Sequence, residues 1–176
     1  MRQPRKIRIG GVYHVVARAN RREFILREAH VKRMFLDTVR RAKDKHSFRI
    51  INMCVMDNHF HLMIEPARDE SLSKIMQWIL SVFARRFNRA YSLQGHVWYD
   101  RFKSRIVSSL RQFIATFAYI DENPVRAELV ARSADYQYGG RAFIRAGPGV
   151  LVDRPSRLVK LLFPGFDRVR LPAPIR

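Results

Sequence analysis

The stretch FRIINMCVMDNHFHLMIEP, residues 48–66, decides the fold, because it holds two apolar runs separated by Asp57-Asn58. Apolar runs joined by a two-residue turn of this type predict a β-hairpin in the middle of a sheet. Successive side chains of a strand point to opposite faces of the sheet. We therefore expect His59 and His61 to share one face beside the turn, with Phe60 on the other face.

The histidine pair suits a cation, because neutral imidazole is a common metal ligand. Two ligands leave a coordination sphere incomplete, so other parts of the chain must supply the rest. Partly buried polar packing is the alternative interpretation of the pair. If Asp57-Asn58 is a two-residue turn, Cys54 lies opposite His61 on the same face, and a thiolate with two imidazoles would suit zinc.

The residues around the hairpin predict an alternating order of strands and helices. The further predicted elements are a strand in GVYHVVARAN (residues 11–20), a helix from Glu28 to about Ser47, a helix from Ser71 to about Tyr91, a strand at RIV (residues 105–107) and a helix from Leu110 to about Asn123. Pro124 is expected to stop the last helix, since the residue before proline avoids helical geometry. The order βαββαβα predicts an α+β fold of the ferredoxin-like type, one antiparallel sheet with helices packed on one face.

Composition indicates a globular protein with a polyanionic partner. The 176 residues are 47% hydrophobic, which is enough for a core in one domain. The net charge of +19 makes nucleic acid the leading partner. An anionic membrane is the competitor, but the chain has no apolar run of spanning length and no secretory signal pattern, so we expect a soluble, cytoplasmic protein without a membrane partner. The single Cys54 excludes an internal disulfide framework.

Two basic segments are candidate phosphate-binding regions. Residues 1–22 carry basic charge without a carboxylate, from Arg2, Arg5, Lys6, Arg8, Arg18, Arg21 and Arg22. GHVWYDRFKSRIVSS, residues 95–109, mixes aromatic side chains with Arg101, Lys103 and Arg105, a pattern that can stack bases and hold phosphates. For residues 1–22 the alternative is a solvated basic face. For residues 95–109 the alternative is a packed strand with exposed cations.

The predicted third helix presents two further polar groups. Tyr119 points roughly away from an apolar stripe formed by Leu110, Phe113, Phe117 and Ile120. Asn123 follows one turn later, so a phenol and an amide oxygen are presented on the same side. Together with the histidine pair they could surround one phosphate and one metal. The alternative interpretation of Tyr119 is an ordinary residue of the helix surface. The alternative for Asn123 is a turn or helix-cap residue.

Four segments, GGVYHVVARANRR, MDNHFHLMIEP, HVWYDRFKS and YIDENPVRAELV, resemble in order and spacing the REP-associated tyrosine transposases of the HUH single-tyrosine transposase family. The resemblance covers about residues 8–140, so we expect an HUH-type domain at 1–140 and a basic, proline-containing C-terminal extension at 141–176. It implies an enzyme that nicks and rejoins single-stranded DNA and recognises hairpins of repetitive extragenic palindromes. It also implies that no ATP is needed, and we expect a monomer or a homodimer.

The resemblance also implies roles for individual residues. His59 and His61 would be metal ligands, Tyr119 the nucleophile that forms a 5′-phosphotyrosine, and Asn123 the residue that completes a site for Mg²⁺ or Mn²⁺. The side chains expected to contact DNA are Arg18, Arg21, Arg22, Trp98, Arg101, Phe102, Lys103 and Arg126. Two rival classes remain open, a nucleic-acid-binding module that has lost catalysis and a zinc hydrolase that uses Cys54.

Overall fold

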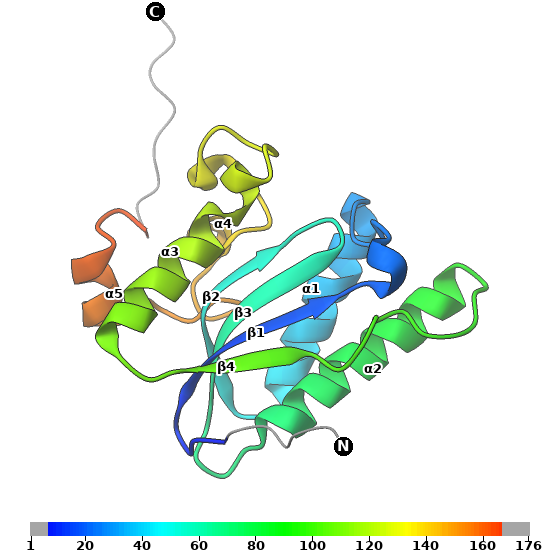
Figure 1. Ribbon diagram of the computed structural model, residues 1–176, viewed down its shortest axis with the longest axis horizontal. Coiled ribbons are helices and arrows are strands. Elements are labelled where there is room, and N and C mark those ends of the chain that lie inside the picture. Colours follow the sequence, from blue (N-terminus) through cyan, green and yellow to red (C-terminus); the bar gives the residue numbers. More distant parts are fainter. Residues whose placement is uncertain (1–6, 167–176) are drawn as a thin grey trace, which may run out of the picture.

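Four strands form one antiparallel sheet in the order β2-β3-β1-β4 (Figure 1). They are β1 (Val12–Arg18), β2 (Phe48–Val55), β3 (His59–Pro66) and β4 (Lys103–Val107). The computed structural model describes residues 7–166, so the basic residues Arg2, Arg5 and Lys6 lie outside the described residues. With its helices, the sheet confirms the predicted α+β, ferredoxin-like fold.

The β2–β3 hairpin has the predicted two-residue turn. The Met56 N–H donates to the His59 carbonyl over 2.9 Å, which leaves Asp57 and Asn58 at the tip. Cys54 pairs with His61 across the two strands, as the sequence predicts for this turn length. On the neighbouring side, His61 pairs with Val16 of β1. Both histidines therefore lie on β3, a central strand that is paired with β2 on one side and with β1 on the other.

Helices α1 (Ala29–Lys45) and α2 (Leu72–Ala90) cover one face of the sheet and form the core with it. The ring of Phe35 lies 4.5 Å from that of Phe60 and 5.5 Å from that of Phe83, measured between centroids. Ser71 caps α2 by accepting from the Lys74 N–H, as predicted. Each fully buried large apolar side chain on this face contributes roughly 1.5–3 kcal/mol to folding.

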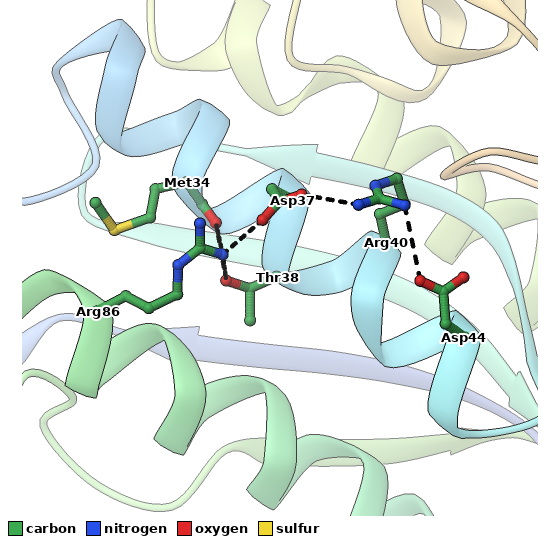
Figure 2. Close-up of polar contacts among 6 residues, drawn as sticks. All are labelled: Met34, Asp37, Thr38, Arg40, Asp44 and Arg86. Atoms are coloured by element: carbon green, nitrogen blue, oxygen red, sulfur yellow. Dashed lines mark hydrogen bonds and ion pairs between the residues drawn. The ribbon is translucent and has the colours of Figure 1, made fainter.

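Cations between α1 and α2 are paired with carboxylates (Figure 2). The Arg86 guanidinium donates to Asp37 over 2.7 Å and to the Thr38 hydroxyl over 2.9 Å. Arg40 contacts Asp37 at 3.2 Å and Asp44 at 3.7 Å. Arg40 and Arg86 are therefore neutralised locally.

Helix α3 (Leu110–Arg126) lies across the opposite face, with the sheet between it and the α1–α2 pair (Figure 1). The Asn52 side chain of β2 donates to the Phe117 carbonyl over 3.2 Å, and Phe117 and Ile120 are fully buried. The expectation that all helices share one face is therefore wrong for α3. Leu110 is 55% exposed and therefore does not belong to the buried stripe.

The prediction that α3 ends at Asn123 is wrong, since the helix runs through Pro124 to Arg126. Proline lacks an N–H and therefore removes one hydrogen bond, which is tolerable in a last turn that has other bonds. The Asn123 side chain donates to the Tyr119 carbonyl over 3.1 Å, and the Ala127 N–H donates to the Asn123 carbonyl over 3.0 Å. These bonds hold Asn123 in a buried position at the start of that turn.

Residues 140–166 pack on the α3 side of the molecule. They include α4 (Gly140–Ala146) and α5 (Arg157–Leu162), while the short 3₁₀ helices η1 (Asn20–Arg22) and η2 (Ser133–Asp135) lie earlier in the chain. The rings of Phe163 and Phe166 contact Phe117 at 4.1 and 4.7 Å. In the described part of the chain, no helix is both long and apolar enough to cross a membrane.

Candidate functional site

A groove opens on the sheet face that α3 covers only in part. Its volume is about 870 Å³, and its walls come from β1, β4, the residues that follow β1 and the middle of α3. The cationic side chains of this basic groove are Arg18, Arg21, Arg22, Arg101, Lys103 and Arg105. Asp100 is the only carboxylate among its described lining residues. The groove is thus strongly electropositive.

Strand register explains why these side chains share one face. His14 pairs with Arg105 of β4, and Arg18 pairs with His59 of β3, so all four point to the α3 side of the sheet. His61 follows on the same face, two residues after His59. The predicted histidine pair therefore lies at the edge of the basic groove.

His14 joins the predicted pair as a third histidine. Its Nε2 lies 3.0 Å from Nδ1 of His61, and the two rings stack with centroids 5.2 Å apart. His59 lies 4.9 Å from His61 between ring centroids and hydrogen-bonds through Nδ1 to the Asn58 side chain at 2.7 Å. His14 was not predicted from the sequence, although period-two alternation from Arg18 through Val16 places it on the same face.

Burial keeps the histidine pair uncharged. Burial, together with the nearby Arg18, lowers the pKa of His59 to about 4. Burial and the neighbouring histidines lower the pKa of His61 to about 3. Neutral imidazole is the form that binds metals.

Tyr119 of α3 lies against His61 and His14. Its ring meets His61 edge-on, with centroids 5.4 Å apart, and lies 5.9 Å from the ring of His14. The side chain is 40% exposed, so the phenol is accessible from the groove that it lines. The Arg126 guanidinium carbon lies 5.6 Å from the ring centroid. The structure therefore brings together a phenol, a cation and the histidine pair.

The histidine nitrogens fit an open divalent-metal site. Nε2 of His61 is buried and has no hydrogen-bond partner among the described residues, as a ligand nitrogen facing a cation would. Asn123 keeps its carbonyl oxygen as a possible ligand, since its amide nitrogen is the atom that donates to Tyr119. Within residues 7–166, no group of three or more His, Cys, Asp or Glu side chains is arranged for a metal. Water or substrate oxygens would have to complete the coordination, which is usual for Mg²⁺.

The zinc arrangement that includes Cys54 is not formed. Cys54 pairs with His61 in the predicted register, yet its thiol is buried and contacts the sulfur of Met56 at 3.5 Å. Burial raises the pKa of this thiol to about 12, and a zinc ligand has to be a thiolate.

The residues predicted to contact DNA divide into two sets. Five of them, Arg18, Arg21, Arg22, Arg101 and Lys103, line the basic groove, and Arg126 lies beside Tyr119. Phe102 is buried, and the Trp98 ring packs 5.5 Å from Phe60 while its N–H donates to the Leu80 carbonyl over 3.0 Å. Phe102 is therefore part of the core, and Trp98 is half-buried against it.

Tyr99 is the exposed aromatic residue of this segment, and the sequence analysis missed it. It is 73% exposed, lines the basic groove and is tied to β1 by a hydrogen bond from its N–H to the Arg18 carbonyl of 3.0 Å. Adjacent side chains of an extended segment point to opposite sides, so Trp98 and Tyr99 are expected to face opposite ways. This alternation alone does not say which of the two rings faces outward.

Comparison with known proteins identifies the class that this fold and site define. The chain belongs to the IS200-like transposase family, because residues 10–123 match the family model described as "Transposase IS200 like". This result confirms the family resemblance of the four sequence segments. No curated protein matches the chain.

Two solved structures are similar to this chain. A REP-associated tyrosine transposase bound to a REP hairpin is similar to this chain, with a TM-score of 0.68, 20% identity and coverage of 88% of this chain and 92% of that one. A putative transposase from Deinococcus radiodurans R1 aligns at 17% identity over 73% of this chain and 92% of that one, with a TM-score of 0.49. At 20% identity, the similarity to the REP-associated tyrosine transposase establishes the fold alone.

Proposed function

We propose that this chain nicks and rejoins single-stranded or hairpin DNA, with Tyr119 as the nucleophile and a divalent metal held by His59, His61 and Asn123. The observation that carries the proposal is the position of Tyr119. Its ring lies 5.4 Å from that of His61 and lines the basic groove. A nucleophile, a metal site and a phosphate-binding surface would then meet in one place.

The basic groove accounts for binding of a DNA strand. No ion pair between its cations and a carboxylate is found in the part of the chain that the structure describes, so these side chains can neutralise phosphates. Tyr99 offers its exposed ring to an unpaired base. The similar REP-associated transposase is bound to a REP hairpin, which supports a hairpin with single-stranded flanks as the substrate.

The chemistry follows from the groups around the phosphate. Tyr119 Oη attacks the phosphorus in line, the bond from phosphorus to the 3′ oxygen breaks, and the phenol keeps the 5′ phosphate. The phenol loses its proton as the bond to phosphorus forms, and the departing 3′ oxygen takes up a proton to become a hydroxyl. When bound, Mg²⁺ or Mn²⁺ supplies polarisation of a nonbridging phosphate oxygen. Attack of a 3′ hydroxyl on the phosphotyrosine reverses the step and rejoins the strand.

Cleavage and binding measured in parallel test this proposal. The wild-type chain should cut a hairpin oligonucleotide with single-stranded flanks when Mg²⁺ or Mn²⁺ is added. His59→Ala should abolish cleavage and keep DNA affinity, because phosphate contacts supply most of the affinity. Asn123→Ala should lose less activity, since an amide is the weaker ligand. Cleavage by His59→Ala at the parental rate would exclude the metal site, and binding without cleavage by the wild type would indicate a DNA-binding module.

A further inference from the structure

We propose that His14 is a positioning residue of the metal site, which holds the proton of His61 on Nδ1 and so leaves Nε2 as the ligand atom. The inference rests on the proposed function, because it concerns the metal site described there. It adds a residue from β1, a strand that contributes no ligand to that site.

The contact between the two rings is direct and built into the sheet. Nε2 of His14 and Nδ1 of His61 are 3.0 Å apart, a normal hydrogen-bond distance. The rings also stack, with centroids 5.2 Å apart and planes at 27°. Since β1 and β3 are adjacent central strands, their pairing fixes the separation of the two side chains. His14 therefore restrains both the position and the orientation of the His61 ring.

A single proton lies between the two nitrogens, and its position decides what His61 can do. If Nδ1 of His61 donates, Nε2 of His61 carries a free lone pair that can bind a cation. If Nε2 of His14 donates instead, His61 carries its proton on Nε2. That nitrogen is buried and without a partner among residues 7–166, so the second arrangement leaves a desolvated donor. The first arrangement is compatible with a metal ligand, and it requires His14 to accept.

Residues that orient a ligating histidine in this way affect metal affinity strongly. Loss of such a hydrogen bond typically weakens metal binding about 10- to 100-fold. Two substitutions separate the hydrogen bond from packing. His14→Phe keeps an aromatic ring against His61 and removes the acceptor, whereas His14→Gln provides an amide oxygen near the place of Nε2 and removes the ring.

The experiment measures Mn²⁺ affinity of the full chain without DNA, by calorimetry or by the loss of the free-ion paramagnetic resonance signal. His14→Phe should bind Mn²⁺ about 10- to 100-fold more weakly than the wild type, and His14→Gln should retain most of the affinity. His96→Ala, which changes an exposed histidine outside the groove lining, should bind like the wild type. Nitrogen NMR should show His61 protonated on Nδ1 in the wild type and a mixture of tautomers in His14→Phe. Circular dichroism confirms that each variant is folded.

Three results would overturn the inference. Wild-type affinity in His14→Phe with an unchanged His61 tautomer would mean that His14 only packs. An equal loss in His14→Gln and His14→Phe would assign the effect to the ring rather than to the hydrogen bond. If the wild type itself bound no Mn²⁺, the proposed metal site would fall and the inference with it, whereas the first two results leave that site standing.

Discussion

The two faces of the sheet are made by the same strands and carry opposite chemistry. In β1, Tyr13, Val15 and Ala17 are buried against α1 and α2, while the alternate residues His14 and Arg18 face the basic groove. In β3, Phe60 belongs to the core and His61 to the candidate metal site. Residues that stabilise the fold and residues of the candidate site therefore alternate along a strand. Substitutions at adjacent positions should affect either stability or activity.

The charges of the two regions differ in the same way. Outside the groove, several cations are paired with carboxylates. Arg86 lies 2.7 Å from Asp37 (Figure 2), and Lys43 lies 2.7 Å from Asp153. In the groove, Asp100 is the only carboxylate among the described lining residues. Six cations therefore share this groove with one carboxylate, which favours binding of a phosphate backbone there.

The largest expected effect comes from neighbouring substitutions in β3. Phe60→Ala should lower the free energy of unfolding by about 3–5 kcal/mol, because it empties a fully buried site. His61→Ala should abolish cleavage while changing the free energy of unfolding by about 1 kcal/mol. Urea denaturation and a cleavage assay on both variants measure the contrast. A His61→Ala variant as unstable as Phe60→Ala would show that the groove face also carries the fold.

A second contrast concerns the aromatic residues after α2. Tyr99→Ala should weaken binding of single-stranded DNA about 5- to 100-fold with little change in stability, because it removes a stacking surface. Phe102→Ala should instead lower the free energy of unfolding by about 3 kcal/mol, since Phe102 is buried. Fluorescence anisotropy with a labelled strand and thermal unfolding distinguish the two. If Tyr99→Ala bound the strand as tightly as the wild type, Tyr99 would not stack on a base in the groove.

A third contrast tests the charges. Replacing Arg101 and Lys103 by alanine should reduce the slope of log affinity against log salt by about 1.4, at about 0.7 per phosphate contact on a single strand. Arg40→Ala with Arg132→Ala removes two positive charges that are paired with carboxylates outside the groove, and should leave the slope unchanged. Equal effects of the two double variants would mean that net charge, not the groove, drives binding.

The smallest expected effect is at Cys54, which pairs with His61 across the hairpin. Cys54→Ala should leave Mn²⁺ affinity and the cleavage rate within about twofold of the wild type, because its protonated thiol takes no part in the site. In the folded wild type the thiol should also resist alkylation until urea unfolds the chain. Loss of bound metal in Cys54→Ala would restore the zinc interpretation.

The sequence predicted the core face better than the groove face. Periodicity places Ile75, Ile79 and Phe83 inward without knowledge of their partners, since burial depends mainly on apolar character. Tertiary contacts, such as the hydrogen bond from Asn52 to Phe117, decide which side of the sheet α3 occupies. They also decide whether the helix continues through Pro124. For the same reason, alternation alone did not identify His14 as the partner of His61 or Tyr99 as the exposed ring. The domain boundary at residue 140 and the oligomeric state remain predictions.

The central claim is that Tyr119, which lies against His61, is the nucleophile, and transfer of DNA to this residue tests it most directly. The chain is incubated with Mn²⁺ and a hairpin oligonucleotide labelled on the 3′ side of its cleavage site. The account predicts a labelled protein whose adduct maps to the Tyr119 peptide, and no adduct in Tyr119→Phe, which keeps the ring against His61. Cleavage without any protein adduct, or normal cleavage by Tyr119→Phe, would show that water is the nucleophile and contradict the account.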